Sequence, residues 1–341
     1  KLFRYFNKEH GKGDVGYRPG EKIAIKVNLV GLITGFGAVN TDRYVFDRYP
    51  DYMNTSPQVM KALLGQLVRE AGVKQSDITI GDTLAYFTSE YYDILHAAFP
   101  DVHYLDRGGK FGRVAAKPSS KPFYWSCRPA GAEPDRIPTC FAEAQYVVNL
   151  ATLKAHTAAG VTLCGKNHFG SLVRWPVQQG YYDMHRGSFQ KRMGVYREQV
   201  DLLGHAHLGG KTVLNLIDGV LSGKHPVDHV PRPFRLPPFD GRWPSSLLAS
   251  QDPVAIDSVA YDFLWSEFDD FPRRPGADDY LHEAALADRP PSGTFYDPNH
   301  AAPRQRLASL GVHEHWNNAA QRKYSRNLGA GKGIELVAVS L

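Results

Sequence analysis

The chain has 341 residues, 43% hydrophobic and 22% charged, with a formal net charge of +5 and a pI near 8.9. This composition is typical of a soluble globular protein that can bury a large core. No run approaches the roughly twenty apolar residues of a membrane span, which argues against a membrane protein. The basic residues are scattered, so we expect no nucleic-acid partner; an anionic small molecule or glycan fits at least as well.

The first half of the chain alternates predicted strands and helices. Residues 21–29 alternate apolar and polar positions, as expected for a strand that ends in polar residues. Ser56 and Pro57 supply a helix cap and a first-turn proline, and Gly72 ends the helix. The predicted elements are strand 21–29, loop 30–55, helix 57–71, strand 77–82, helix 89–99 and strand 102–106.

The second half predicts further strands and one long helix. They are a strand that begins at Val147, a strand over 212–219, a helix over 251–268 capped by Asp252, and a closing strand over 335–340. The β-α-β rhythm favours an α/β fold, with a mixed, mostly parallel sheet flanked by helices and long loop insertions. Without a repeat or a clear linker, we expect one elaborated domain over 1–341 that ends in a loop-rich C-terminal extension over 271–341.

The segment Val147–Gly170 carries the strongest functional signal. Polar or reactive side chains crowd into fifteen of its residues: Lys154, His156, Cys164, Lys166, Asn167 and His168. Such groups are costly beside a core unless they bind something. Glycines and alanines between them let backbone and ligand approach closely. We interpret the segment as the floor of an active or binding site.

Polar side chains also follow the predicted strands. They are Lys26 and Asn28, Asp82, Asn149 and Lys154, and Asp218. Ligands of open α/β sheets bind beyond the carboxyl ends of strands, so these side chains could form one pocket for an anion, a sugar or a metal ion. Each could instead tie down a local turn. Four such strand ends together favour a functional site.

The residue types indicate acid–base chemistry. His156 lies two residues after Lys154, so both side chains point to the same face of an extended chain. A lysine beside an imidazole tends to lower both pKa values, which suits this pair to act as acid and base. Lys166 and Asn167 would stabilise negative charge on a substrate.

Substrate binding is assigned to a separate set of side chains. They are Lys26, Asn28, Asp82, Asp218 and Asp257. Asp257 lies one turn after the helix cap, among apolar residues where a carboxylate needs a partner. We expect Lys154 or Lys166 to form a buried ion pair with Asp257, and this pair would organise the site.

A divalent metal ion is a further candidate as a cofactor. Its ligands would come from His156, His168 and His185, with Asp82 or Asp218. These residues match no compact metal signature such as HExxH. The pair His205-x-His207 lies in a glycine-rich segment and is as consistent with a helix cap.

The cysteines are Cys127, Cys140 and Cys164, and they include no CxxC pair. This spacing argues against iron–sulfur clusters and zinc ribbons. Cys127 and Cys140 flank a loop rich in Pro and Gly, and they are equally compatible with a disulfide and with two unpaired thiols.

Several motifs occur in a fixed order: KVNL, NTSPQVMKALLGQLVREAG, ITIGD, LKAH…GVTLCGKNHFG, LIDG and SQDPVAIDSVA. In this order they resemble a bacterial family known as domain of unknown function number 362, over about residues 20–270. The resemblance implies an α/β fold but no established reaction. Some members carry ferredoxin-type cysteine clusters, which this chain lacks, so electron transfer is not implied. The long loops and GHAHLGGKT are similar to exported members, which implies a periplasmic or extracellular setting.

Two functions stay open at this point. The first is an exported enzyme for a polar anionic or carbohydrate-like substrate, in which Asp82 and Asp218 orient the substrate or a divalent ion. Aromatic loops would then offer sugar-stacking surfaces: Phe123, Tyr124, Trp125, Trp175, Tyr181, Tyr182 and Trp243. The second is a non-catalytic protein that binds a solute or glycan, or that self-associates in an extracellular assembly.

Overall fold

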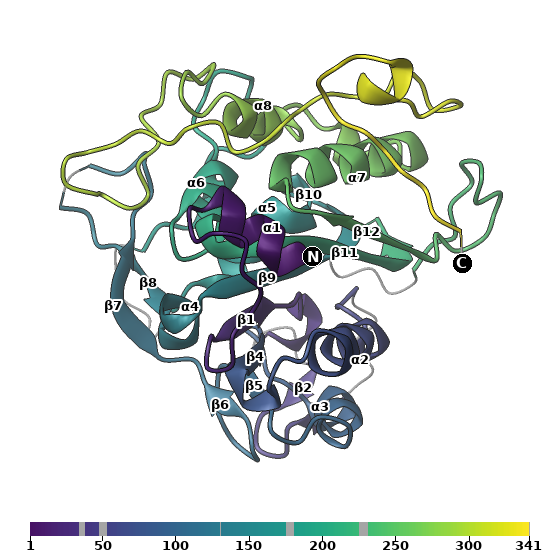
Figure 1. Cartoon of the computed structure of the whole chain (residues 1–341). Coiled ribbons are helices and arrows are strands. Elements are labelled where there is room, and N and C mark those ends of the chain that lie inside the picture. Colours follow the sequence, from purple (N-terminus) through teal and green to yellow (C-terminus); the bar gives the residue numbers. More distant parts are fainter. Residues whose placement is uncertain (34–37, 48–52, 130, 175–180, 225–230, 341) are drawn as a thin grey trace.

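A computed structural model describes residues 1–33, 38–47, 53–129, 131–174, 181–224 and 231–340 (Figure 1). The strands are β1 (Ile23–Lys26), β2 (Val39–Asn40), β3 (Val45–Phe46), β4 (Ile78–Gly81), β5 (His103–Asp106), β6 (Val114–Ala115), β7 (Pro118–Phe123), β8 (Asp135–Pro138), β9 (Tyr146–His156), β10 (Gly160–Val161), β11 (Thr212–Gly223) and β12 (Ser246–Ser250). The α-helices are α1 (Leu2–Glu9), α2 (Pro57–Gly65), α3 (Ser89–His96), α4 (Thr139–Glu143), α5 (Leu163–Asn167), α6 (Glu198–Gly204), α7 (Pro253–Glu267) and α8 (Asp279–Ala285). A π-helical turn, Gln66–Glu70, continues α2.

One large sheet forms the centre of the molecule. Its strand order is β12-β11-β9-β1-β4-β5-β6, and β10 pairs with β9. The pairs from β11 to β6 are parallel, whereas β12 and β10 pair antiparallel. The predicted α/β fold with a mixed, mostly parallel sheet is therefore confirmed.

Helices cover both faces of this sheet. Alternate residues of a strand point to opposite faces, so each face needs helices to bury its apolar side chains. Ile23 and Ile25 of β1 pack in one cluster with residues of α1, α2 and α3. Residues from the second half of β9, among them Leu153, pack on α5, α6, α7 and α8. Every residue of β9 is buried, as expected for a central parallel strand.

The order of the strands reverses between β1 and β9. From β1 the chain adds β4, β5 and β6 on one side, and it later places β9, β11 and β12 on the other. At such a switch point the connections leave in opposite directions, and a crevice opens beyond the carboxyl ends of the two strands. The sheet topology therefore places a ligand crevice beside Lys26 and Lys154.

Most predicted elements are present within a few residues. Ser56 caps α2 by accepting the Val59 N–H, and Asp252 caps α7 by accepting the N–H groups of Val254 and Ala255. The predicted strand over 335–340 is wrong. Val337 and Val339 are 70% and 78% exposed, and the Leu336 backbone pairs with the Asn327 side chain instead of a strand.

The segment after α7 is mainly irregular. It runs across α7 and α8 and is drawn in yellow-green to yellow in Figure 1. The longest described α-helix, α7, has 15 residues. None of the described helices has the length and apolar character needed to cross a membrane.

Candidate active site

A cavity of about 350 Å³ lies at the carboxyl ends of β1, β4 and β9. Its lining includes most of the polar residues predicted from the strand ends and from the segment Val147–Gly170. The lining residues are Lys26, Asn28, Val30, Ile33, Asp82, Leu84, Lys154, His156, Thr157, Thr162, Lys166, Asn167, Phe169, Gly170 and His185. Catalytic and substrate-binding candidates from separate elements are thus brought to one cavity.

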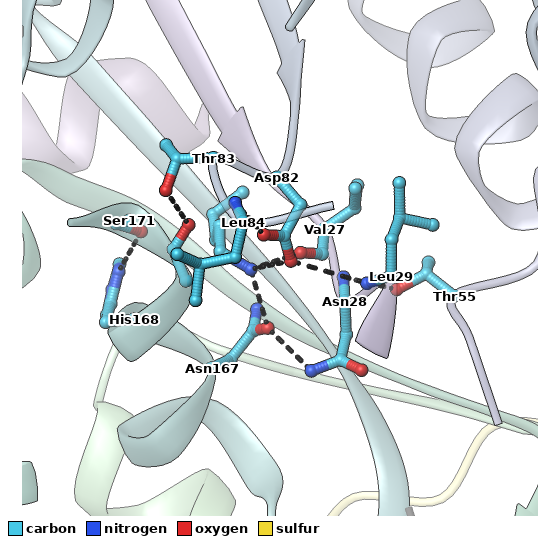
Figure 2. Close-up of polar contacts among 12 residues, drawn as sticks. Val27, Asn28, Leu29, Thr55, Asp82, Thr83, Leu84, Asn167, His168 and Ser171 are labelled. Carbon is cyan, nitrogen blue, oxygen red and sulfur yellow. Dashed lines mark hydrogen bonds and ion pairs between the residues drawn. The ribbon is translucent and has the colours of Figure 1, made fainter. Parts of the chain in front are cut away.

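Lys26 and Asp82 form a buried ion pair on the cavity wall. The Lys26 Nζ lies 2.9 Å from Asp82 Oδ2 and also donates to Asn167 Oδ1 at 3.1 Å and to the Val27 carbonyl. Asp82 accepts the Leu84 N–H at 2.9 Å. Figure 2 shows Asp82, Asn28 and Asn167 converging from β4, from the end of β1 and from α5. Burial lowers the pKa of Lys26, and the Asp82 charge opposes that shift.

Asn167 holds this network together and has no amide hydrogen left for a substrate. Its Oδ1 also accepts the Asn28 amide at 3.1 Å. Its Nδ2 donates to Asn149 Oδ1 at 2.8 Å and to the Leu150 carbonyl at 3.3 Å. Because an amide offers two hydrogens, the predicted role of Asn167 in stabilising a substrate's charge is replaced by a positioning role.

Lys154 is fully buried, and within the described part of the chain its hydrogen-bond acceptors are neutral oxygens. Its Nζ donates to Asn28 Oδ1 at 2.6 Å and to the Met53 carbonyl. Burial lowers its pKa well below the usual value, and the charges of Lys166 and Lys26 lower it further. The uncharged amine is therefore strongly favoured compared with an exposed lysine.

His156 projects from the end of β9 with its tautomer set by the backbone. Its Nδ1 accepts the N–H groups of Ala158 and Ala159 at 3.0 and 3.1 Å. An acceptor Nδ1 places the proton of a neutral imidazole on Nε2. The ring stacks near His185, with centroids 5.8 Å apart.

Lys166 lies on α5 at the cavity wall without a hydrogen-bond or ion-pair partner among the described residues. Burial lowers its pKa to about 8, the Lys26 charge acts in the same direction, and the Asp183 charge opposes the shift. Burial also lowers the pKa of His185 to about 4, with a contribution from the Lys166 charge. Among the described lining residues, the ammonium of Lys166 is thus the group available to a ligand's negative charge.

Asp257 lies outside the cavity and forms no ion pair with Lys154 or Lys166, so that prediction is wrong. Its two carboxylate oxygens accept the N–H groups of Cys164 and Gly165, each at 2.8 Å, and Oδ2 also accepts the Tyr280 hydroxyl. The backbone of Leu163 has a φ of 43°, which is costly for a bulky residue. Asp257 therefore stabilises the strained start of α5, and α5 presents Lys166 to the cavity.

Asp218 is not among the residues that line the cavity. Its oxygens accept the N–H of Ser56 at 2.9 Å and of Val220 at 3.1 Å. Its charge acts on Lys154, for which it raises the pKa against the effect of burial. Asp218 is thus placed to anchor the start of α2 and to influence Lys154 rather than to touch a ligand.

The predicted metal site of His156, His168 and His185 is not assembled. His168 is fully buried away from the cavity, its Nδ1 lies 3.3 Å from Ser171 Oγ, and burial lowers its pKa to about 3. His205 lies at the end of α6, where its Nδ1 accepts the His207 N–H. Among the described residues, potential ligand atoms converge in a different place, on Asp278, His282, His313 and His315.

None of the described residues among the predicted stacking aromatics lines this cavity. Trp125 is buried and donates its indole N–H to Asp135, and Tyr124 stacks on His300. Trp243 is exposed elsewhere, and Trp175 falls outside the described residues. Cys127 and Cys140 are both free thiols in the structure.

Sequence reasoning missed the apolar wall of the cavity, formed by Val30, Ile33, Leu84 and Phe169. It also did not identify why Gly170 is needed. A Cβ at this position would lie 2.8 Å from the Lys26 Nζ and 3.0 Å from Asp82 Oδ1. The close spacing of glycine and ionisable residues in GKNHFG was the signal for that contact.

The chain belongs to the DUF362 family, a domain of unknown function, whose family model matches residues 23–262. This match agrees with the family resemblance of its motifs and covers β1 through most of α7. No curated protein and no solved structure matches the chain. The cavity lies entirely within the matched region, whereas the cluster around His313 lies beyond it.

Proposed function

We propose that the cavity binds a small polar anion and is the active site of an enzyme that uses acid–base catalysis. The observation that carries this proposal is the unpaired Lys166. Within the described part of the chain, three lysines and one carboxylate line the cavity, and that carboxylate, Asp82, is already paired with Lys26. Lys166 forms no ion pair among the described residues, and the Asp183 carboxylate acts on its charge only from beyond ion-pair distance. A bound carboxylate, phosphate or sulfate group would stabilise such an ammonium directly.

The size and walls of the cavity narrow the substrate class. A volume of about 350 Å³ lies near the small end of ligand pockets, so a molecule of monosaccharide size fits better than a polymer. Lys166 lies on one wall, and Val30, Ile33, Leu84 and Phe169 offer an apolar surface. A phosphorylated or carboxylated sugar, or a hydroxy acid, combines an anionic group with a C–H-rich face.

Lys154 and His156 are suited to opposite proton-transfer roles. A neutral Lys154 amine has two hydrogens, and both are used by Asn28 and the Met53 carbonyl, so its lone pair is left to accept a proton. His156 carries its neutral-state proton on Nε2 and can donate it. We assign Lys154 as the base, His156 as the acid and Lys166 as the anion-binding group.

Titration calorimetry with inorganic phosphate, and with a panel of sugar phosphates and hydroxy acids, tests the binding step. Lys166→Met should weaken the affinity for any bound anion by at least tenfold, because it removes the unpaired charge. Lys8→Met, which removes an exposed lysine on α1, is the matched control and should leave affinity unchanged. Equal affinities for wild type and Lys166→Met would refute the anion site.

The catalytic step is tested on the panel compounds that bind, with conversion followed by NMR. Lys154→Ala and His156→Ala should abolish turnover and change the affinity less than Lys166→Met does. If compounds bind tightly and none is converted, the catalytic assignment is wrong and the non-catalytic binding protein is supported.

We also propose that the protein works in the periplasm or outside the cell. The similarity of its long loops and its GHAHLGGKT segment to exported family members supports this setting. Fractionation of cells that express the gene with its native upstream region tests it, and recovery in the cytoplasmic fraction alone would contradict it.

A further inference from the structure

A second group of ionisable side chains lies where the C-terminal extension crosses α7 and α8. Asp278, His282, His313 and His315 each offer one ligand atom, and these four atoms lie within 4.8 Å of one another. Asp278 precedes α8 and His282 follows one turn later. His313 and His315 alternate on an extended segment, so their rings point to the same side.

Three of the separations between these atoms lie near the edge length of a tetrahedral zinc site. The His282 Nε2 lies 3.2 Å from the His313 Nε2 and 3.8 Å from Asp278 Oδ2, which lies 3.4 Å from the His315 Nε2. Zinc–nitrogen bonds of 2.0–2.1 Å place tetrahedral ligands about 3.3 Å apart. The four side chains therefore surround a volume suited to one small cation.

The outer hydrogen bonds of His313 set it in a metal-binding tautomer. Ser258 Oγ uses its only hydrogen to donate to the Val254 carbonyl at 2.8 Å. The 2.8 Å contact between Ser258 Oγ and the His313 Nδ1 must therefore be donated by the imidazole. With its proton on Nδ1, neutral His313 directs the Nε2 lone pair towards His282.

The outer hydrogen bonds of His315 follow the same pattern. Its Nδ1 lies 2.6 Å from Asp262 Oδ1, and Asp262 is buried and also accepts the Trp316 N–H and the Tyr324 hydroxyl. A carboxylate behind a histidine is the usual outer partner of a metal-bound imidazole, and it directs the Nε2 lone pair towards the metal. Here that lone pair faces Asp278 Oδ2, a contact that is repulsive unless a cation or a proton lies between them.

We propose that Asp278, His282, His313 and His315 form a structural zinc site. Three imidazoles and one carboxylate suit zinc, whereas calcium and magnesium prefer oxygen ligands. Four protein ligands fill a tetrahedral shell and leave no position for a substrate. The metal fastens the segment around His313, which lies beyond the family-matched region, to α8 and to the outer partners on α7. This inference does not depend on the proposed function.

Metal analysis of the tag-free protein, with zinc titration after chelation, tests the site. Wild type should bind about one zinc per chain. His282→Gln should weaken zinc binding more than about 100-fold, and Asp262→Asn, which alters an outer partner, should weaken it about 10- to 100-fold. His282 is about a third exposed, with 34% of its side chain accessible, so the variant is expected to fold, which circular dichroism will check.

The matched control is His207→Gln in the other His-x-His pair, which should retain full zinc binding. The absorption spectrum of the cobalt-substituted protein should report tetrahedral coordination. Absence of saturable zinc binding to wild type would overturn the proposal, and so would full zinc affinity in folded His282→Gln. In either case a protonated His315 between Asp262 and Asp278 accounts for the cluster.

Discussion

The cavity and the histidine cluster both bring ionisable groups together. They differ in which groups remain for a ligand: a donor in the cavity and acceptors in the cluster. In the cavity, Lys26 donates to Asp82 and Lys154 donates to Asn28. The ammonium of Lys166 has no acceptor among the described residues. In the cluster, the Nδ1 protons of His313 and His315 are donated to Ser258 and Asp262, so the Nε2 lone pairs remain to bind a cation. The comparison shows that the unused donor or acceptor, rather than the number of charged residues, indicates whether a site receives an anion or a cation.

The largest expected effect on stability concerns the buried ion pair between Lys26 and Asp82 on the cavity wall. Lys26→Met leaves Asp82 without its ionic partner, so the free energy of unfolding should fall by about 3–5 kcal/mol. Urea denaturation measures this loss. Lys22→Met breaks the exposed pair with Glu143 and should cost at most about 1 kcal/mol. Similar losses for the two variants would show that the Lys26 pair is not a special support of the cavity.

The next effect concerns Asp257, which supports α5 from the side opposite the cavity. Asp257→Ala leaves two buried N–H groups without acceptors and should reduce the free energy of unfolding by about 2–3 kcal/mol. Asp288→Ala, at an exposed position, is the control and should change stability by less than about 0.5 kcal/mol.

The Asp257 effect should also depend on pH. Burial raises the pKa of Asp257 from 3.8 to about 6. Between pH 3.8 and about 6, the folded state therefore binds more protons than the unfolded state. Ionisation of Asp257 thus lowers the stability of the fold as pH rises through this range. The stability difference between wild type and Asp257→Ala should be larger at pH 5 than at pH 7. A constant difference would contradict the raised pKa.

Zinc should stabilise the protein through the histidine cluster and not through the cavity. At a free zinc concentration 100 times the Kd, the gain in unfolding free energy is about 2.7 kcal/mol, a rise of several degrees in Tm. Chelation should remove the gain in wild type and in Lys166→Met. A zinc-dependent Tm in His282→Gln would place the metal elsewhere.

The smallest expected change in stability is that of Lys166→Met, and its sign distinguishes a ligand-binding lysine from one that stabilises the fold. Lys166→Met removes an unpaired charge and should raise the unfolding free energy at pH 7 by about 1 kcal/mol, while it abolishes anion binding. The pKa of Lys166 falls from 10.5 to about 8 on folding. The unfolded state thus binds more protons between these values, and wild-type stability should rise across this pH window.

Anion affinity should change in the opposite direction. The ammonium of Lys166 loses its proton as pH rises through 8, so the affinity measured by calorimetry should decrease above that value. Affinity that is unchanged between pH 7 and pH 9.5 would remove Lys166 from the binding site.

The sequence allowed the cavity to be predicted because parallel strands share one carboxyl edge. Lys26, Asp82 and Lys154 each lie within two residues of the carboxyl end of a strand, and their convergence needs only the sheet order. The Asp257 ion pair was predicted wrongly because a sequence does not show that N–H groups of α5 compete for the same carboxylate. His168 follows α5 directly, and the turn of the backbone there directs it away from the cavity.

The histidine cluster could not be predicted for a different reason. Asp278 and His282 are separated from His313 by a long irregular segment, and only the folded path returns it to α8. The i, i+4 and i, i+2 spacings were visible, but neither is specific by itself. The predicted strand over 335–340 failed because alternation alone does not provide a neighbouring strand.

Adjacent residues of α7 point to the two sites. Asp257 binds the start of α5, whereas Ser258 binds His313, and an α-helix turns by about 100° from one residue to the next. A rotation of α7 about its axis would therefore displace both side chains from their partners. The two contacts together fix the rotation of this helix about its own axis, so the position of α5 at the cavity and the position of His313 in the cluster depend on the same helix.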